Sequence, residues 1–353
     1  MAVNLLSNYA KKIQERFVKE SLTKERFSKE ISFSGVKTVQ IMSPTTVPVN
    51  DYKRSGDNRY GTPQEMQDVI QEMTLSQDKS FSLTVDKGNN KDQGGLKAAG
   101  RMLNKQVREQ CVPTMDKYML NKLSLTGGHI VWNSTKLSKT NIVERITAGT
   151  AQLDNDEIPD SGRTLFVTPD GYALIRLSPE FVGLEKLGNR SLSKGTVGEF
   201  AGMTVVKVPK GRWPKNVNFM ICHREAAVEC LKISETHLHQ DPPGISGNLL
   251  EGRYYYDIFV MMEKACGIYV EVDTSTGAGT VTANPAIAAS GGALTCTTSG
   301  ATIYSTVDGS DPRYSTTAKA GATPAATAAG TVVKAYAVKE GSFPSAVVEQ
   351  VLE

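Results

Sequence analysis

The sequence predicts an α+β protein with a second, smaller all-β unit at its C-terminal end. Stretches in which apolar and polar residues alternate, as in strands, are interspersed with stretches that have an apolar residue every third or fourth position, as in helices. They do not follow the regular strand–helix–strand period of a parallel α/β protein. The composition changes abruptly near residue 274, which separates the two units.

Charge and length exclude several classes of protein. The chain has 353 residues, 39% of them hydrophobic and 22% charged, and its net charge is +3. This nearly neutral balance is not typical of a chain wrapped around nucleic acid or of an acidic tail. The longest apolar run, residues 258–262, is far shorter than the roughly 20 residues that a membrane helix needs. We expect no membrane segment.

The N-terminus and the cysteines indicate a protein made in the cytosol. The first residues carry scattered charges and no small-residue cleavage site, so a secretory signal is not expected. The five cysteines are dispersed and show no CxxC spacing. We therefore expect reduced thiols, with neither a disulfide framework nor a zinc site.

Residues 1–35 are predicted to form an N-terminal arm. Its apolar residues, Ile13 and Phe17 among them, recur about one helical turn apart between charged residues. Such a pattern indicates an amphipathic helix, which packs either on its own domain or on a neighbouring chain.

A hairpin is predicted after this arm. Residues 72–75 and 80–86 both have strand character, the segment SQDK between them has the composition of a turn, and one face of the pair is apolar. A lone hairpin is marginally stable in water. It must therefore pack on another surface, which belongs to another subunit if the tip does not fold back on its own domain.

The remaining elements up to residue 273 follow in a mixed order. A long helical pattern of apolar residues runs from Leu96 to Met119, and Pro113 predicts a kink or break at Val112. The next elements are a helix, a buried strand with a Thr-Pro-Asp helix start, a glycine-hinged strand pair, another buried strand and a long strand hairpin; their residues are 140–153, 165–175, 195–209, 216–223 and 251–273.

No catalytic, metal-binding or cofactor-binding site is predicted. Residues 183–191 have glycines at the spacing of a phosphate-binding loop, but Asn189 stands where the lysine is required. His237 and His239 share one strand face without a third suitable ligand apart from Asp241. Residues 154–157 begin like a calcium loop, but Ile158-Pro159 replaces the glycine turn. We discount the phosphate-binding loop, interpret the histidine pair and the acidic segment as surface features, and expect no enzyme.

The C-terminal unit is predicted to be a small β-sandwich. Residues 274–353 contain only nine charged residues, and Ala, Thr, Gly and Ser make up 48 of these 80 positions. Residues 274–280 have the composition of a flexible linker. In residues 281–353, short alternating strands flank Asp308-Gly309 and Asp311-Pro312, which are tight-turn signals.

Three stretches of residues 1–273 resemble the major capsid proteins of tailed bacteriophages with the Hong Kong 97-like fold. They are CVPTMDKYMLNKLS (111–124), RTLFVTPDGYALI (163–175) and GTVGEFAGMTVVKVP (195–209). The resemblance implies a shell domain at residues 36–273. Its parts would be an extended loop at about 50–93, a spine helix at about 94–124, an axial domain at about 140–250 and peripheral-domain strands at about 251–273.

This resemblance implies a structural protein of the virion, assembled in the bacterial cytoplasm. Many copies would form hexamers and pentamers of an icosahedral shell around double-stranded DNA, with a separate scaffolding protein and a portal. We expect the hairpin to overlap the spine helix of the next subunit, and the arm to bind a second neighbour. The expected intersubunit contacts are Arg54, Arg59, Met73, Leu75, Lys79, Phe81 and Leu83 from the hairpin region, and Ile13 and Phe17 from the arm.

Residues 301–317 and 332–348 resemble the small immunoglobulin/fibronectin-like module at the C-terminus of chitobiase-type glycosidases. That resemblance implies an outward-facing module for decoration of the capsid or weak binding of surface glycans, without catalysis. Two alternatives stay open. An encapsulin-like compartment has the same shell architecture without DNA, and a surface glycan-binding protein would account for the module but needs an export signal.

Overall fold

The computed structural model describes most of the chain as two compact units. The described residues are 20–29, 31, 38–44, 49, 51–55, 58–60, 68–92, 99–178, 196–275 and 280–353. Unit 1 comprises Met1–Ser34, Leu75–Val260 and Lys264–Gly279, and unit 2 comprises Gly35–Thr74, Met261–Glu263 and Thr280–Glu353. Each unit is described by itself.

A six-stranded sheet forms the centre of unit 1. Its strand order is β4-β11-β8-β5-β7-β6. Two helices, α4 (Ile142–Asn155) and α5 (Pro169–Arg176), contribute Ile142, Ile146, Leu153 and Ile175 to the core on this sheet. The strands are β4 (His129–Asn133), β5 (Arg163–Val167), β6 (Thr196–Phe200), β7 (Met203–Lys207), β8 (Val217–His223) and β11 (Ile268–Asp273).

Local sequence signals account for several of these elements. Thr168 caps α5, because its side-chain oxygen accepts a hydrogen bond from the backbone N–H of Gly171 at 3.1 Å. Ala201 and Gly202 both have positive φ, at 48° and 74°, and join the antiparallel strands β6 and β7. Two positive φ angles match the right-handed twist of a hairpin, which favours glycine at the second position. The Thr-Pro-Asp helix start and the glycine-hinged strand pair lie where the sequence places them.

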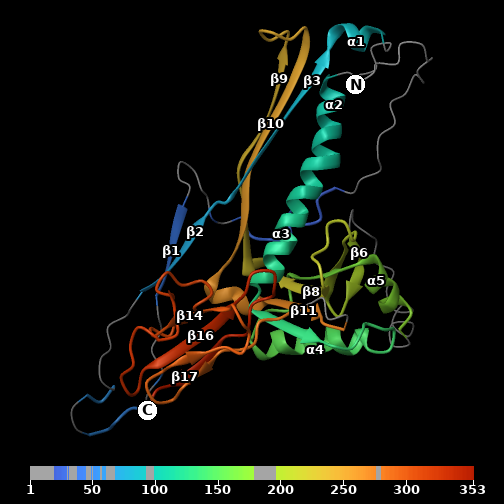
Figure 1. The fold of residues 1–353 in the computed structure, drawn as a ribbon. Helices are drawn as coiled ribbons and strands as arrows, with labels where there is room; N and C mark the ends of the chain where they lie inside the picture. Colours follow the sequence, from blue (N-terminus) through green and yellow to red (C-terminus); the bar gives the residue numbers. More distant parts are fainter. Residues whose placement is uncertain are drawn as a thin grey trace. The chain divides into compact units, whose positions relative to one another are not determined.

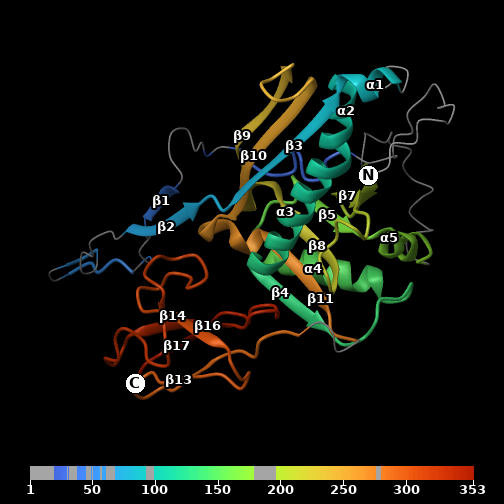
Figure 2. The same cartoon turned by 45° about the horizontal axis from the view of Figure 1, so that its top comes forward.

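A long three-stranded ribbon projects from the same unit. Its order is β3-β10-β9, and both pairings are antiparallel. A helix runs beside it in both ribbon views (Figures 1 and 2). The strands are β3 (Gln77–Asp86), β9 (Ala227–Gln240) and β10 (Gly247–Val260), and short helices lie at α1 (Lys87–Asp92), Arg224–Ala226 and Met262–Gly267.

The helix beside the ribbon passes through Pro113 without ending. It consists of α2 (Ala99–Gln106), a π-helical turn (Val107–Cys111) and α3 (Val112–Thr126). The backbone N–H of Val112 donates to the carbonyl of Val107, five residues earlier. The wider π turn disturbs the hydrogen-bond ladder just before the proline, which has no N–H to donate. The irregularity lies where the sequence predicts a kink or break, but it takes the form of a π-helical turn, and the helix continues beyond it.

Two predicted hairpins are wrong. Residues 77–86 do not fold back on residues 72–75; they form β3 and pair with β10, while β2 (Asp68–Thr74) pairs with β1 (Thr38–Pro44). Residues 251–273 are likewise no hairpin, because β10 belongs to the ribbon and β11 to the six-stranded sheet. In neither case do the two adjacent strand-like segments pair with each other.

Unit 2 contains the β1–β2 hairpin and the C-terminal module, Thr280–Glu353. The module has a two-stranded sheet, β12-β13, and a four-stranded sheet of order β15-β14-β16-β17. Ile303, Val333, Ala335 and Ala337 point to one side of the larger sheet and form a small core with Leu294 and Leu352. The strands are β12 (Ala286–Ile287), β13 (Leu294–Thr295), β14 (Thr302–Thr306), β15 (Lys319–Ala320), β16 (Val332–Val338) and β17 (Val348–Val351).

Candidate functional site

The structural features that bear on function are exposed surfaces and segments of the chain that buried carboxylates hold in place. Within the described residues no group of three or more His, Cys, Asp or Glu side chains is arranged to hold a metal ion. His237 and His239 are stacked with ring centroids 6.0 Å apart, and each lies near a glutamate, Glu235 and Glu251 respectively. The glycine-containing segment 183–191 lies outside the described residues.

The basic candidates Arg54 and Arg59 belong to an exposed turn between β1 and β2. The backbone N–H of Lys53 donates to the carbonyl of Arg59 at 3.0 Å, and the rings of Tyr52 and Tyr60 meet edge-to-face at 5.0 Å. Tyr60 is 87% exposed. Exposed aromatic rings next to arginines are typical of surfaces that bind another protein. No neighbouring chain is present, so the two arginines stay predictions.

The apolar candidates differ in their exposure. Met73 and Leu75 are fully buried within the single chain, whereas Leu83 is 38% exposed on the ribbon. Phe81 lies over Gly252 of β10, where an added Cβ atom would come within 2.3 Å of the Phe81 ring. A neighbouring subunit can therefore contact Leu83 directly, but it can contact Met73 and Leu75 only if the residues that cover them move. As intersubunit contacts, all of them remain predictions.

A shallow cavity lies between the ribbon and the helix. Lys79 and Phe81 of β3 line it together with Cys111 at the π turn and Tyr254 and Tyr256 of β10. Burial raises the pKa of the Cys111 thiol, although a hydrogen bond with Tyr254 acts in the opposite direction. Burial therefore disfavours the thiolate form of Cys111.

A buried carboxylate, Asp257, holds the start of β3 against the helix. It accepts hydrogen bonds from the backbone N–H and the hydroxyl of Ser76, at 3.0 and 2.8 Å. Asp257 also accepts a hydrogen bond from the Tyr118 hydroxyl at 2.9 Å and forms an ion pair with Lys122 at 2.5 Å. Burial, with Asp257 as a further cause, raises the pKa of Tyr118 to about 12. Residues separated by up to 181 positions are thereby joined at one point.

A second buried carboxylate, Asp116 on α3, anchors the N-terminal segment 20–29. Its oxygens accept from the Ser21 hydroxyl at 2.7 Å, from the Leu22 N–H at 3.0 Å and from the Thr23 hydroxyl at 3.0 Å. Arg212 pairs with the same carboxylate at 2.6 Å. Asp116 is thus bound from both sides, as a buried charge requires.

This anchoring corrects part of the prediction for the arm. Residues 20–29 form turns and bends, and Leu22 and Phe27 are buried in their own unit. The apolar side chains at this end of the arm are therefore covered within their own unit. Ile13 and Phe17 fall outside the described residues.

A third buried carboxylate, Glu271, lies on a strand of the six-stranded sheet and forms an ion pair with a helix residue. Glu271 of β11 accepts from Arg145 of α4 at 3.0 Å and from Asn218 of β8 at 2.8 Å. Burial raises the pKa of Glu271, although both hydrogen bonds act against it. The guanidinium of Arg145 also donates to the carbonyl of Thr135 at 2.7 Å, which ties the segment before α4 to this pair.

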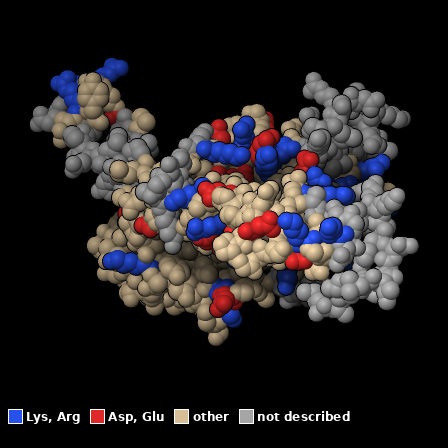
Figure 3. All heavy atoms as spheres, turned by 90° about the horizontal axis from the view of Figure 1, so that it is seen from above, with Lys and Arg blue, Asp and Glu red and all other residues tan. Residues whose placement is uncertain are grey.

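The exposed charges form no large patch of one sign on the face drawn in Figure 3. Lys and Arg side chains there are interspersed with Asp and Glu. Arg253 and Asp78 form an exposed ion pair across the ribbon at 2.6 Å. None of the described helices is long and apolar enough to span a membrane.

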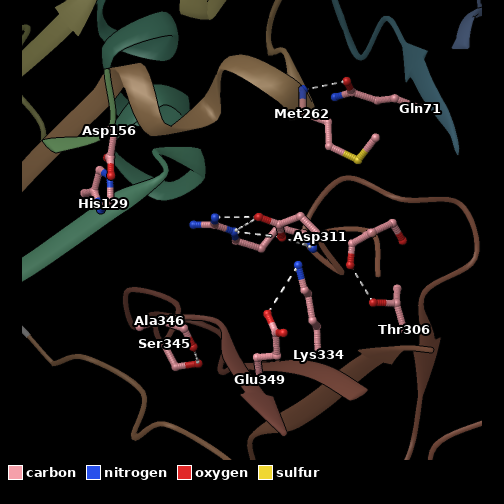
Figure 4. Close-up of polar contacts among 12 residues, drawn as sticks. Gln71, His129, Asp156, Met262, Thr306, Asp311, Lys334, Ser345, Ala346 and Glu349 are labelled. Carbon is pink, nitrogen blue, oxygen red and sulfur yellow. Dashed lines mark hydrogen bonds and ion pairs between the residues drawn. The ribbon is translucent and has the colours of Figure 1, made fainter. Parts of the chain in front are cut away.

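Some polar contacts of the C-terminal module lie within short turns and others cross its sheet. The guanidinium of Arg313 donates to the Asp311 carboxylate from Nε at 3.0 and 3.1 Å and from Nη2 at 2.6 Å, and its central carbon lies 5.2 Å from the centroid of the Tyr314 ring. Lys334 of β16 and Glu349 of β17 pair across the sheet at 3.4 Å. Figure 4 shows the contacts of Asp311, Lys334 and Glu349.

Comparisons with known proteins agree with this architecture. The family model described as "Fn3 associated" matches residues 293–352. No curated protein matches the sequence. A structure of Mycobacterium phage Che8 has a TM-score of 0.61 and 17% identity, covering 76% of this chain and 98% of that one.

Two further solved structures are similar. The capsid structure of cyanophage P-SCSP1u has a TM-score of 0.61 at 12% identity, and the mature capsid of bacteriophage PhiM1 has 0.59 at 13%. Each comparison covers 76% of this chain and 92% of the other. The predicted fold class is confirmed: the chain has the α+β fold of phage capsid proteins and carries a C-terminal module of the Fn3-associated type.

Proposed function

We propose that this protein is the major capsid protein of a tailed phage, which assembles as hexamers and pentamers into an icosahedral shell around double-stranded DNA. The observation that carries the proposal is the extent of the structural similarity. The match includes 92% of each of the two chains from capsid structures, so the likeness covers an almost complete capsid chain. A likeness confined to a common substructure would have left much of those chains unmatched.

The exposed surfaces support self-assembly. The ribbon presents Leu83, Leu231 and Leu238 with 38–48% of their surface exposed, and the turn between β1 and β2 presents Tyr52 and Tyr60. Extended segments of this kind bury their apolar surface when copies of the chain pack together. An obligate shell subunit shares interfaces of a few thousand Å² with its neighbours.

The charge distribution supports weak, sequence-independent contact with DNA. A net charge of +3 and interspersed charges give little long-range attraction to phosphate. Such a shell encloses DNA without binding it tightly. A scaffolding protein and a portal would guide assembly, and the C-terminal module would face outward for decoration or weak glycan binding.

Sedimentation of the purified full-length protein tests this proposal. We expect particles far larger than the 38.2 kDa monomer, with nucleic acid in particles taken from infected cells. A matched pair of variants locates the interface: Tyr60→Asp, in the exposed turn, should reduce the particle fraction, whereas Asp170→Asn, at an exposed ion pair of α5, should not.

The outcomes separate the proposed function from its alternatives. Shells that never contain nucleic acid would favour an encapsulin-like compartment. A stable monomer at every concentration would contradict both shell functions and would leave the surface glycan-binding alternative.

A further inference from the structure

The β1–β2 hairpin has an open edge. Among the described residues, β1 and β2 form a two-stranded sheet, so one side of β2 is paired with β1 and the other side lacks a neighbouring strand in that sheet. An unpaired strand edge exposes backbone N–H and C=O groups that readily accept another strand. A two-stranded hairpin is also too small to be stable without a further packing partner. The open edge of β2 therefore needs a specific cover.

A loop of the C-terminal module, residues 308–317, is built to present a short extended segment. The carbonyl of Asp311 accepts from the N–H groups of Tyr314 and Ser315, at 3.2 and 3.1 Å, which closes a turn. At the end of the loop, the Thr317 hydroxyl donates to the Asp308 carboxylate at 2.6 Å. These contacts fix Ser315 and Thr316 between two braced positions. The loop is thus ordered by its own side chains, which lowers the entropy cost of docking.

This loop meets the open edge of β2. Ser315 and Gln71 are partners in an isolated antiparallel bridge. The backbone N–H and the hydroxyl of Thr316 both donate to the carbonyl of Ile70, at 3.3 and 3.1 Å. The module therefore adds the beginning of a third strand to the hairpin.

A second contact fixes the same point of β2 from another part of the unit. The side-chain carbonyl of Gln71 accepts from the backbone N–H of Met262 at 2.9 Å (Figure 4), and Gln71 is only 6% exposed. A buried amide that is hydrogen-bonded in this way specifies one position of the strand. Residues 70 and 71 are thus held by two segments that follow them by almost two hundred residues or more.

We propose that the C-terminal module binds the open edge of β2 in its own chain and holds the β1–β2 hairpin in place. The module is then a structural clamp on the hairpin, in addition to any role on the outside of a shell. The proposal concerns the single chain and does not depend on the proposed function, because its tests use unassembled protein.

A disulfide tests the bridge directly. Gln71 and Ser315 are opposed residues flanked by the Thr316–Ile70 hydrogen bond, a geometry in which Cα atoms lie about 4.5 Å apart and a disulfide can form. In the full chain, Gln71→Cys with Ser315→Cys should form a disulfide under mild oxidation, at monomer mobility in a non-reducing gel. Gln71→Cys with Thr302→Cys, at the exposed first residue of β14 in the same module, is the control and should stay unlinked.

Three results would overturn the proposal. The designed pair could stay reduced, or both pairs could link equally, which would indicate a loosely tethered module. A ladder of linked chains would show that the edge is covered by another copy. Peptide mass spectrometry distinguishes the designed disulfide from links to the five native cysteines.

Gln71→Cys also removes the buried hydrogen bond with Met262. Hydrogen exchange therefore provides a second test that leaves Gln71 in place. Thr316→Val removes only a surface hydroxyl from the contact. We expect the amides of β1 and β2 to exchange about fivefold faster in this variant, the effect of losing one hydrogen bond. Thr302→Val is the matched control and should leave them unchanged. Equal exchange in the two variants would contradict the clamp.

Discussion

Unit 1 and the C-terminal module hold their segments together in different ways. In unit 1, buried carboxylates join segments that are distant in sequence: Asp116 binds residues more than 90 positions away, and Asp257 binds Ser76, 181 positions away. In the module, Asp308 and Asp311 bind side chains between two and nine positions away. The first arrangement organises the tertiary fold, and the second organises individual turns.

The difference predicts how each region responds to the loss of one carboxylate. When a buried carboxylate is removed, the charged partner that it leaves behind is still buried and still carries its full desolvation cost, so the stability of the whole unit falls. A turn carboxylate is replaced in part by water, so its removal affects only the loop. Four substitutions, taken from the largest expected effect to the smallest, test this comparison.

Asp257→Asn should have the largest effect. The variant leaves Lys122 next to a neutral amide and replaces the acceptor of the Ser76 and Tyr118 hydrogen bonds, which should lower the free energy of unfolding by about 4 kcal/mol. Chemical denaturation of the unassembled protein measures this. Asp78→Asn, which breaks the exposed pair with Arg253, is the control and should leave the denaturation midpoint unchanged. Equal effects of the two variants would remove the distinction between buried and exposed carboxylates.

Asp116→Asn should cost about 3 kcal/mol and release the N-terminal segment. Arg212 loses its charged partner, and the contacts of Ser21 and Thr23 with the carboxylate weaken. Limited trypsin digestion should then cleave rapidly after Lys24 or Arg26. Asp170→Asn is the matched surface control. Unchanged cleavage in Asp116→Asn would show that the segment is held by its apolar residues alone.

Asp308→Asn should lower stability by only about 1 kcal/mol near pH 7. Burial raises the pKa of Asp308, but hydrogen bonds from Ser310 and Thr317 outweigh it, so the pKa lies below its ordinary value. The ionised carboxylate therefore stabilises the fold above the unfolded pKa, and this contribution is lost as the pH falls through the folded value. The difference between wild type and variant should shrink on acidification, as measured by denaturation from pH 7 to pH 3.

Glu229→Gln should have the smallest effect, and the opposite sign. Burial raises the pKa of Glu229, although Lys29 acts against it, and Oε2 of this residue is buried without a hydrogen-bond partner among the described residues. The contribution of the carboxyl is complete below its unfolded pKa and is lost as the pH rises through the folded value. The variant should therefore be at least as stable as wild type at pH 7, and this advantage should disappear near pH 4. A clear loss of stability at pH 7 would contradict this account.

Local signals in the sequence predicted many of the elements and the short-range β6–β7 pair, but they could not predict how distant strands pair. The helix start at Thr168 and the strand at residues 163–167 depend on neighbouring residues, and both are present. β3 alternates just as its neighbour β2 does, so the turn-like SQDK between them suggested a hairpin. Its true partner, β10, begins 161 residues after β3 ends. Pairing over such a distance is decided by the tertiary fold.

The contacts made by β2 and by the buried carboxylates could be predicted from the sequence only in part. The sequence predicted a hairpin of residues 72–75 and 80–86, which does not form, and it did not indicate that the C-terminal module contacts β2 at Ile70. Asp257 could have been suspected, because it interrupts the apolar run YYYDIFV, and a charge in a buried strand requires a partner. Asp116 has no comparable signal, since a single carboxylate in a helical pattern is usually solvated.

Cryo-electron microscopy of particles formed by the full-length protein tests the central claim most directly. We expect closed icosahedral shells in which each subunit has the fold described here, with the ribbon and the turn between β1 and β2 in contact with adjacent subunits. A population of isolated chains, with Tyr60 and Leu83 facing solvent at every protein concentration, would contradict the account.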